Sequence, residues 1–219
     1  MPIITIDGPA SSGKGTVAKK VARQLGFNYL DSGSIYRALG LMVINGQVEK
    51  SNINAILKLI DHMDLSFVDD RVILNGQDET TMLRTENVGM LASAIAKIPE
   101  VRTRLLNFQQ SFDQVPGLVT DGRDMGSVVF PKADLKIFLT ASAEKRALRR
   151  HFQLQKSSDS GTIGAILRDI TARDKQDRER SVAPLVYDST YKVLDNSDLS
   201  IEETVQTVID WYHDCVIPA

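Results

Sequence analysis

Short apolar runs alternate with longer amphipathic stretches along this chain. A short apolar run is typical of a strand buried on both faces, and a period near 3.6 residues predicts a helix. The predicted strands cover residues 3–6, 28–30, 118–120, 135–139 and 192–194. The predicted helices cover residues 14–25, 33–44, 52–63, 86–98, 101–114, 143–155, 163–180 and 201–215. This alternation favours an α/β fold, with a five-stranded parallel sheet covered by helices on both faces.

A second pattern interrupts this alternation in the first half of the chain. Residues 65–68 and 71–74 carry strand-forming apolar side chains, and Asp69 and Asp70 between them favour a turn. This arrangement predicts a β-hairpin. Asn75-Gly76 is a strong signal for another tight turn, which predicts a third short strand. We therefore expect a small antiparallel β insertion in the α/β fold.

The insertion is expected to form a subdomain of about residues 40–112 within one domain that spans residues 1–219. Farther along the chain, Ser200 and Glu203 have the spacing of a capping box, in which each side chain bonds to the other residue's main-chain N–H. The last predicted helix is therefore expected to begin at this pair.

Composition and charge exclude several classes of protein. A hydrophobic content of 42% is enough for a sizeable core, and a net charge of −2 without a long basic run argues against a nucleic-acid partner. No stretch approaches the ~20 apolar residues of a membrane span, and Asp7 interrupts the first apolar run too early for a signal peptide. The one cysteine, Cys215, is interpreted as a packing residue on a helix face. We expect a soluble, cytoplasmic monomer.

The segment from Gly8 to Thr16 carries the strongest functional signal. It lies between a predicted strand and a predicted helix, as a phosphate-binding loop (P-loop) does. Main-chain N–H groups of such a loop surround the phosphates of a nucleoside triphosphate, and Lys14 would reach the outer phosphates. The loop residues are Gly8, Pro9, Ala10, Ser11, Ser12, Gly13, Lys14, Gly15 and Thr16.

One position departs from the usual loop. Ser or Thr normally follows the lysine and holds Mg²⁺, but Gly15 stands there and the hydroxyl moves to Thr16. Direct Mg²⁺ ligation by the protein is therefore left open. Thr16 and Asp121, an acid at the end of the third predicted strand, are the candidate ligands.

Polar residues also follow the second predicted strand. In a parallel sheet, residues just beyond the carboxyl end of a strand face the ligand crevice. Ser32 is placed there, although it can instead cap the helix that follows. Arg37 lies about one turn into that helix, and its planar guanidinium suits a phosphate.

The third predicted strand ends in a turn that contains two acids, Asp121 and Asp124, with Arg123 and two glycines. Charges this close to a strand end are costly to bury unless they are paired or bind a ligand. The turn is therefore a candidate site, with an internal Asp–Arg pair as the alternative.

Two later helices carry arginines on one face each. Spacings of three and four residues place Arg146, Arg149 and Arg150 together, and likewise Arg173, Asp177 and Arg180. Phosphoryl transfer requires positive charge around the migrating group, which makes these arginines candidates. Solvated helix faces with internal ion pairs are the alternative.

Together these segments resemble the bacterial cytidylate kinases, or CMP/dCMP kinases, a family of P-loop nucleoside monophosphate kinases. The similarity covers essentially the whole chain and includes the hairpin insertion. The matching segments are Gly-x4-Gly-Lys-Gly-Thr at 8–16, Asp-Ser-Gly-x-Ile-Tyr-Arg at 31–37, Asp-Gly-Arg-Asp-Met-Gly at 121–126 and Arg-x3-Asp-x2-Arg at 173–180.

The resemblance implies a role for each matching residue. It implies Mg²⁺-dependent transfer of the γ-phosphoryl group of ATP to CMP or dCMP, with a short helical lid at about residues 143–163. The implied catalytic residues are Lys14, Arg123 and Arg180. The implied ATP contacts are the loop residues 8–16 with Arg149 and Arg150. The implied CMP contacts are Arg37, Arg123 and Arg180 at the phosphates, Ser32, Arg173 and Asp177 at the sugar, and Ser93, Arg102 and Asp124 at the base.

Three alternatives remain at this stage. The nearest is a P-loop kinase that also accepts UMP, because only the base-reading residues would differ. A GTPase-like switch would need a guanine-reading Asn-Lys-x-Asp motif, which this sequence lacks. A nucleotide-binding module without catalysis would not need arginines over the acceptor phosphate.

Overall fold

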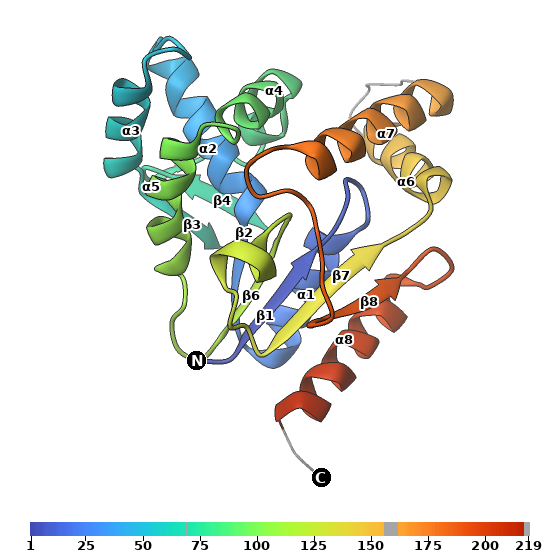
Figure 1. The fold of residues 1–219 in the computed structure, drawn as a ribbon. Coiled ribbons are helices and arrows are strands. Elements are labelled where there is room, and N and C mark those ends of the chain that lie inside the picture. The colour runs from blue at the N-terminus through green and yellow to red at the C-terminus, as the bar shows by residue number, and fades with distance from the viewer. Residues whose placement is uncertain (69, 156–161, 217–219) are drawn as a thin grey trace. The chain divides into compact units, whose positions relative to one another are not determined.

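The computed structural model describes residues 1–68, 70–155 and 162–216. It divides the chain into two compact units, one formed by Met1–Tyr29 with Asp113–Ala219 and one formed by Leu30–Phe112 (Figure 1). Asp69 of the expected hairpin turn and residues 156–161 of the expected lid lie outside the described residues.

A five-stranded sheet with the order β2-β6-β1-β7-β8 organises the fold. The pairs β1–β6, β1–β7 and β7–β8 are parallel. The chain visits β2 and β6 on one side of β1 and then β7 and β8 on the other, so β1 is central. The strands are β1 (Ile3–Asp7), β2 (Asn28–Asp31), β6 (Leu118–Gly122), β7 (Leu135–Thr140) and β8 (Tyr191–Asp195). The predicted α/β fold with a five-stranded parallel sheet is confirmed.

The two faces of β1 have different surroundings within the first unit. Ile4 and Ile6 belong to a buried apolar cluster with residues of helices α1 (Lys14–Leu25) and α8 (Ile201–Val216). Thr5 and Asp7 alternate to the opposite face, where they meet the short π-helix η2 (Met125–Val129). One face of the strand therefore builds the core, and the other carries polar groups.

Helices α6 (Ala143–Gln155) and α7 (Ile163–Glu179) lie side by side in Figure 1. Ala147 of α6 and Ile166 and Ile170 of α7 form a buried cluster between them. Most other charged residues of the two helices are exposed, as expected for amphipathic helices, but Arg146 of α6 and Asp174 of α7 are buried.

The second unit contains the insertion. Its three-stranded antiparallel sheet has the order β3-β4-β5, and Asn75 and Gly76, both with positive φ of 49° and 81°, turn the chain between β4 and β5. These are the backbone angles that an Asn-Gly turn favours. The elements are α2 (Ser32–Asn45), α3 (Ile53–Asp61), β3 (Leu65–Val68), β4 (Arg71–Leu74), β5 (Gln77–Asp78), the 3₁₀ helix η1 (Met82–Arg84), α4 (Glu86–Ile95) and α5 (Pro99–Gln110).

Most differences from the predicted elements lie at their ends. The predicted helix 101–114 begins earlier, at Pro99, because proline is well placed in a first helical turn. It ends at Gln110. The capping box is present, since Glu203 N–H donates to Ser200 Oγ (3.1 Å) and Ser200 N–H donates to Glu203 Oε2 (2.8 Å). The interpretation of Cys215 as a packing residue was wrong, because its side chain is exposed.

None of the helices in the described part of the chain combines the length and apolar character that crossing a membrane requires.

Gly8 tests how closely the loop after β1 approaches the sheet. A Cβ added at Gly8 would lie 2.1 Å from the main-chain oxygen of Leu139 in β7. We predict that Gly8→Ala lowers the free energy of unfolding by about 3 kcal/mol, because backbone cannot move aside as a side chain can. Urea denaturation measures this loss. Gly26→Ala is the control: Gly26 has φ 68° but open space around it, so the loss there should be about 1 kcal/mol. Equal losses would contradict the close approach.

Candidate active site

The loop between β1 and α1 has the backbone geometry of a phosphate-binding loop. Gly13, with φ 90°, is the N-cap of α1, and Ser11 also has a positive φ of 59°. Left-handed residues at alternate positions, with Ser12 between them, curl the main chain so that N–H groups can converge on an anion. The first turn of α1 follows directly, and its N-terminal dipole adds positive potential at the same place.

Side chains from outside the loop hold its carbonyl oxygens. Arg146 Nη1 donates to the oxygen of Ala10 at 3.1 Å. The oxygen of Ser12 accepts from Arg149 Nη1 at 3.2 Å and from Asn196 Nδ2 at 3.0 Å. Arg149 also donates to Oδ1 of Asn196 at 2.9 Å, and burial lowers the pKa of its guanidinium. Arg149 therefore supports the loop, and Asn196 is a partner that sequence reasoning missed.

The end of the loop, at Gly15, lies beside the carboxylate of Asp121. Lys14 Nζ donates to the oxygen of Pro9 at 3.2 Å. A Cβ at Gly15 would lie 3.6 Å from Oδ1 of Asp121, which accepts a hydrogen bond from the Tyr29 hydroxyl at 2.7 Å. Asp121 is buried at the end of β6, and Thr16 is exposed in the first turn of α1. The start of α1 thus lies beside Asp121, at a distance where a side chain at position 15 would make ordinary van der Waals contact with the carboxylate.

Two arginine–carboxylate pairs connect the turn after β6 with α7. Arg123 Nε donates to Oδ2 of Asp177 at 2.6 Å. Arg180, at the end of α7, donates through Nη2 to Oδ1 of Asp124 at 3.3 Å and through Nε to the oxygen of Ala183. These contacts orient the Arg123 guanidinium against Asp177 and the Arg180 guanidinium against Asp124.

Three nearby arginines affect the pKa of the Asp177 carboxyl. Burial raises the pKa of the Asp177 carboxyl, but the positive charges of Arg123, Arg173 and Arg180 outweigh burial and bring the net pKa below its usual value. Asp177 is therefore a carboxylate near neutral pH, and it balances part of the arginine charge. Arg173 itself is exposed on α7.

Asp7 is a buried carboxylate that sequence reasoning did not select. Its side chain is 0% exposed, and its two oxygens accept from the main-chain N–H groups of Met125 and Gly126, both at 2.8 Å. The hydroxyl of Tyr191 donates to Asp7 Oδ2 at 3.0 Å. Burial raises the pKa of Asp7 to about 6. Asp7 thereby fixes the turn that carries Arg123 and Asp124.

In the second unit, Ser32 is held by α5. Its hydroxyl donates to Oε1 of Gln109 at 2.8 Å, and both side chains are buried. The capping alternative for Ser32 was wrong, because Asp31 is the N-cap and accepts from the N–H of Ser34 at 3.0 Å. No sequence motif pointed to Gln109, which is a further residue that sequence reasoning missed.

Arg37 contacts main-chain oxygens near the start of α4. Its Nη1 donates to Leu83 at 2.7 Å and to Thr85 at 3.4 Å. A Cβ at Gly89 would lie 2.9 Å from the guanidinium, so glycine makes room for this side chain. Arg37 is thus fixed between α2 and α4.

Arg102 and Ser93, the predicted base-reading residues of this unit, are half-buried on α5 and α4. The Arg102 guanidinium lies over the ring of Tyr36, 5.8 Å from its centroid, and donates to the oxygen of Ala96 at 3.3 Å. This cation–π contact orients the arginine.

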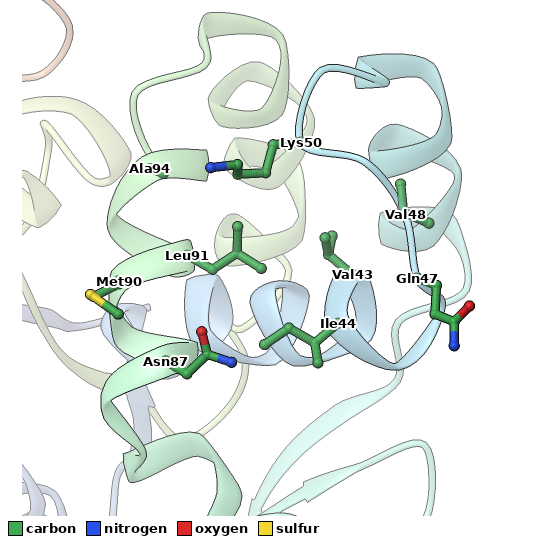
Figure 2. A pocket seen from close by; sticks show the side chains of 9 residues that line it. All are labelled: Val43, Ile44, Gln47, Val48, Lys50, Asn87, Met90, Leu91 and Ala94. Carbon is green, nitrogen blue, oxygen red and sulfur yellow. The ribbon is translucent and has the colours of Figure 1, made fainter.

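The second unit also contains an open groove of about 470 Å³. Figure 2 shows side chains of α2 and α4 on its two sides, with Lys50 at one end. The lining residues are Val43, Ile44, Gln47, Val48, Lys50, Asn87, Met90, Leu91 and Ala94. They do not include any of the predicted site residues, so this groove is separate from them.

The structure thus distributes the predicted residues between two units. The first unit brings together Arg123, Asp124, Asp177 and Arg180, and places Arg149 at the loop. Arg150 is exposed on α6, and no contact brings it to this group among the described residues. Ser32, Arg37, Ser93 and Arg102 belong to the second unit. Within residues 1–68, 70–155 and 162–216, no three His, Cys, Asp or Glu side chains form a metal cluster.

A phosphate-binding loop follows the central strand of a parallel sheet, and Arg123, just beyond the adjacent strand, and Arg180, at the end of α7, are paired nearby. This combination defines the class of P-loop kinases. A crystal structure of an uncharacterized protein from Eubacterium ventriosum ATCC 27560 shares the fold, with a TM-score of 0.56 and 14% identity over 97% of this chain and 98% of that chain. A family model described as Cytidylate kinase matches residues 4–214, and the chain belongs to this family.

Curated relatives agree with the family model. The chain is 48% identical over 211 residues to a cytidylate kinase of Ralstonia nicotianae, covering 96% of this chain and 92% of the relative. It is 49% identical over 218 residues to a cytidylate kinase of Burkholderia cenocepacia, covering 100% and 96%. The resemblance noted from the sequence motifs is confirmed.

The raised pKa of Asp7 predicts a pH-dependent loss of stability. The folded-state pKa of about 6 lies above the ordinary value of 3.8, so the unfolded chain releases this proton first and stability falls as the pH rises between these values. The loss reaches about 3 kcal/mol above pH 6. Asp7→Asn has no carboxyl group at this position and should not show this pH-dependent loss. The unfolding free energy of the wild type minus that of the variant should therefore decrease from pH 4 to pH 7.

Urea unfolding at several pH values measures this difference. Asp198→Asn, which removes a carboxylate that is 86% exposed, supplies the baseline. An offset between wild type and Asp7→Asn that stays constant with pH would contradict the assignment.

Proposed function

We propose that this protein transfers the γ-phosphoryl group of ATP to the 5′-phosphate of CMP or dCMP, giving ADP and the nucleoside diphosphate. The single observation that carries the proposal is identity of 48–49% to curated cytidylate kinases over nearly the whole chain. The family model also matches residues 4–214, so the similarity extends over nearly the whole chain and is not confined to the phosphate-binding loop.

The donor is assigned to the loop of residues 8–16. Its N–H groups and the N-terminus of α1 suit the phosphates of ATP, and Lys14 supplies a movable positive charge for the outer phosphates. Arg149 is already fixed against the loop by Ser12 and Asn196. In this proposal Arg149 lies near the nucleotide and holds the shape of the loop that binds it, and Arg150 joins the donor site.

The acceptor is assigned to the arginine, serine and carboxylate side chains that the family resemblance implies. Arg123 and Arg180 are each paired with a carboxylate, which limits their motion and presents the guanidinium groups in fixed orientations. They are proposed to surround the phosphates together with Arg37. Ser32, Arg173 and Asp177 are proposed to contact the sugar.

The chemistry requires alignment and charge neutralisation. An oxygen of the acceptor phosphate forms a bond to the γ-phosphorus, and the bond from this phosphorus to the β,γ-bridging oxygen breaks, with both electrons leaving on ADP. The acceptor phosphate has a second pKa of about 6 and is mostly ionised at neutral pH, so no general base is needed. Lys14, Arg123 and Arg180 are proposed to stabilise the negative charge in the transition state.

Mg²⁺ is part of this proposal. The buried carboxylate of Asp121 stands beside Gly15, and Thr16 adds a hydroxyl in the same turn of α1. Oxygen ligands of this kind fit Mg²⁺, which usually keeps several waters and binds through substrate phosphates. When bound, the ion would neutralise phosphate charge. Asp121 and Thr16 are the residues that would hold it.

The proposal also includes a lid and a cellular compartment. Residues 143–163 are proposed to close over the donor, which would exclude water from the reaction. The enzyme is proposed to act as a cytoplasmic monomer. One cysteine in the whole sequence fits a reducing compartment.

The decisive experiment measures ADP release with ATP, Mg²⁺ and each of CMP, dCMP, UMP and AMP in parallel. We expect turnover with CMP and dCMP, and kcat/KM for UMP at least about a hundredfold lower, because uracil mismatches buried polar groups. Similar values for CMP and UMP would indicate a kinase of broader choice. No ADP release with CMP would overturn the proposed function.

Asp124 is proposed to read the cytosine amine, with Arg102 donating to the ring acceptors and Ser93 beside them. Cytosine presents a donor and uracil an acceptor at this position, so a carboxylate discriminates between them and an amide does not. We predict that Asp124→Asn reduces the CMP-to-UMP ratio of kcat/KM by at least about tenfold. Steady-state kinetics with both substrates measure the ratio, and Asp210→Asn on α8 is the control. An unchanged ratio would show that Asp124 serves only its pair with Arg180.

A further inference from the structure

Arg146 contacts three parts of the first unit at once. Its Nη1 donates to the loop oxygen of Ala10 at 3.1 Å, and its Nε donates to the oxygen of Ala141 at 2.9 Å. The same Nη1 lies 2.6 Å from Oδ2 of Asp174 on α7. The side chains of Arg146 and Asp174 are only 7% and 11% exposed. One guanidinium therefore joins the phosphate loop, the end of β7 and helix α7.

The contact with Ala10 determines where a neighbouring N–H group points. In a trans peptide, the carbonyl oxygen of one residue and the N–H of the next point in opposite directions. Since Arg146 holds the Ala10 oxygen on the outside of the loop, the N–H of Ser11 is directed to the other side. Arg149 and Asn196 act in the same way on Ser12 and direct the N–H of Gly13.

The contact with Asp174 links the loop to α7. Asp174 is buried, and its other oxygen, Oδ1, has no hydrogen-bond partner among the described residues. The attraction to Arg146 is therefore the principal interaction that keeps this carboxylate in place. The neighbouring positions on α7 include Asp177, which holds Arg123.

We propose that Arg146 is a positioning residue: it orients the Ser11 N–H for the donor phosphates and ties that peptide group to α7 through Asp174. A peptide group that is already oriented need not reorganise when the triphosphate binds. This role rests on the proposed function for its kinetic consequences, and its effect on nucleotide binding is independent of turnover.

A purely structural role makes a different prediction. A buried ion pair can often be replaced by apolar side chains of similar volume with little loss of stability. If Arg146 and Asp174 serve only packing, Arg146→Met combined with Asp174→Leu should leave nucleotide binding unchanged. If Arg146 positions the loop, the same variant should fold and bind the nucleotide weakly.

The test compares this double variant with the full-length wild type. Calorimetric titration with ADP and Mg²⁺ gives the nucleotide affinity, and steady-state kinetics give KM for ATP and for CMP. We expect the ADP dissociation constant and the KM for ATP to rise by at least about tenfold, with changes below about threefold in KM for CMP and in kcat at saturating ATP. Arg146→Lys, which keeps a cation beside Asp174 but lacks the branched guanidinium, should recover part of the loss.

Lys145→Met is the matched control, because Lys145 is the adjacent cation on α6 and its pair with Asp198 is exposed. It should leave all four quantities unchanged. Unchanged ADP affinity in the folded double variant, or in Arg146→Lys should the double variant not fold, overturns the proposal, as does an equal rise in both KM values. If the wild type fails to phosphorylate CMP, the proposed function fails, whereas the ADP titration still decides the role of Arg146.

Discussion

The requirement that a buried carboxylate be hydrogen-bonded connects the parts of the site in the first unit. Asp7 ends β1, and the phosphate loop begins at the next residue. Its oxygens accept from Met125 and Gly126, which directly follow Arg123 and Asp124. An unpartnered carboxylate at this depth would be very costly, so the turn after β6 must remain against the end of β1. The position of Arg123 in this turn relative to the phosphate loop follows from that constraint.

The charged groups of the first unit form a connected set. Arg146, Arg123 and Arg180 each pair with a different carboxylate, and Asp174 and Asp177 stand one turn apart on α7. Each pair fixes an arginine that would otherwise sample many rotamers, at the cost of removing charge from water. The pairs stabilise the fold modestly, and their larger effect is to hold guanidinium groups and loop carbonyls in defined orientations.

The sequence predicted the features that depend on short-range patterns. The strands, the Asn75-Gly76 turn and the phosphate loop are all specified by neighbouring residues. Residues whose importance depends on distant partners were missed. Asp7 showed only as a break in an apolar run, since its partners lie 118 to 184 positions away. Arg146 was grouped with Arg149 and Arg150 on one helix face, but helical spacing alone could not show that Arg146 is buried and Arg150 exposed.

Helix α7 has a consequence for how motion could spread through the first unit. Asp174 and Asp177 grip Arg146 and Arg123 respectively, and the intervening peptide units of an α-helix are nearly rigid. Rotation of α7 about its axis would therefore strain both ion pairs at the same time. Displacement of the whole helix would likewise move both paired arginines together, whereas loss of one pair leaves the other carboxylate in place on the helix.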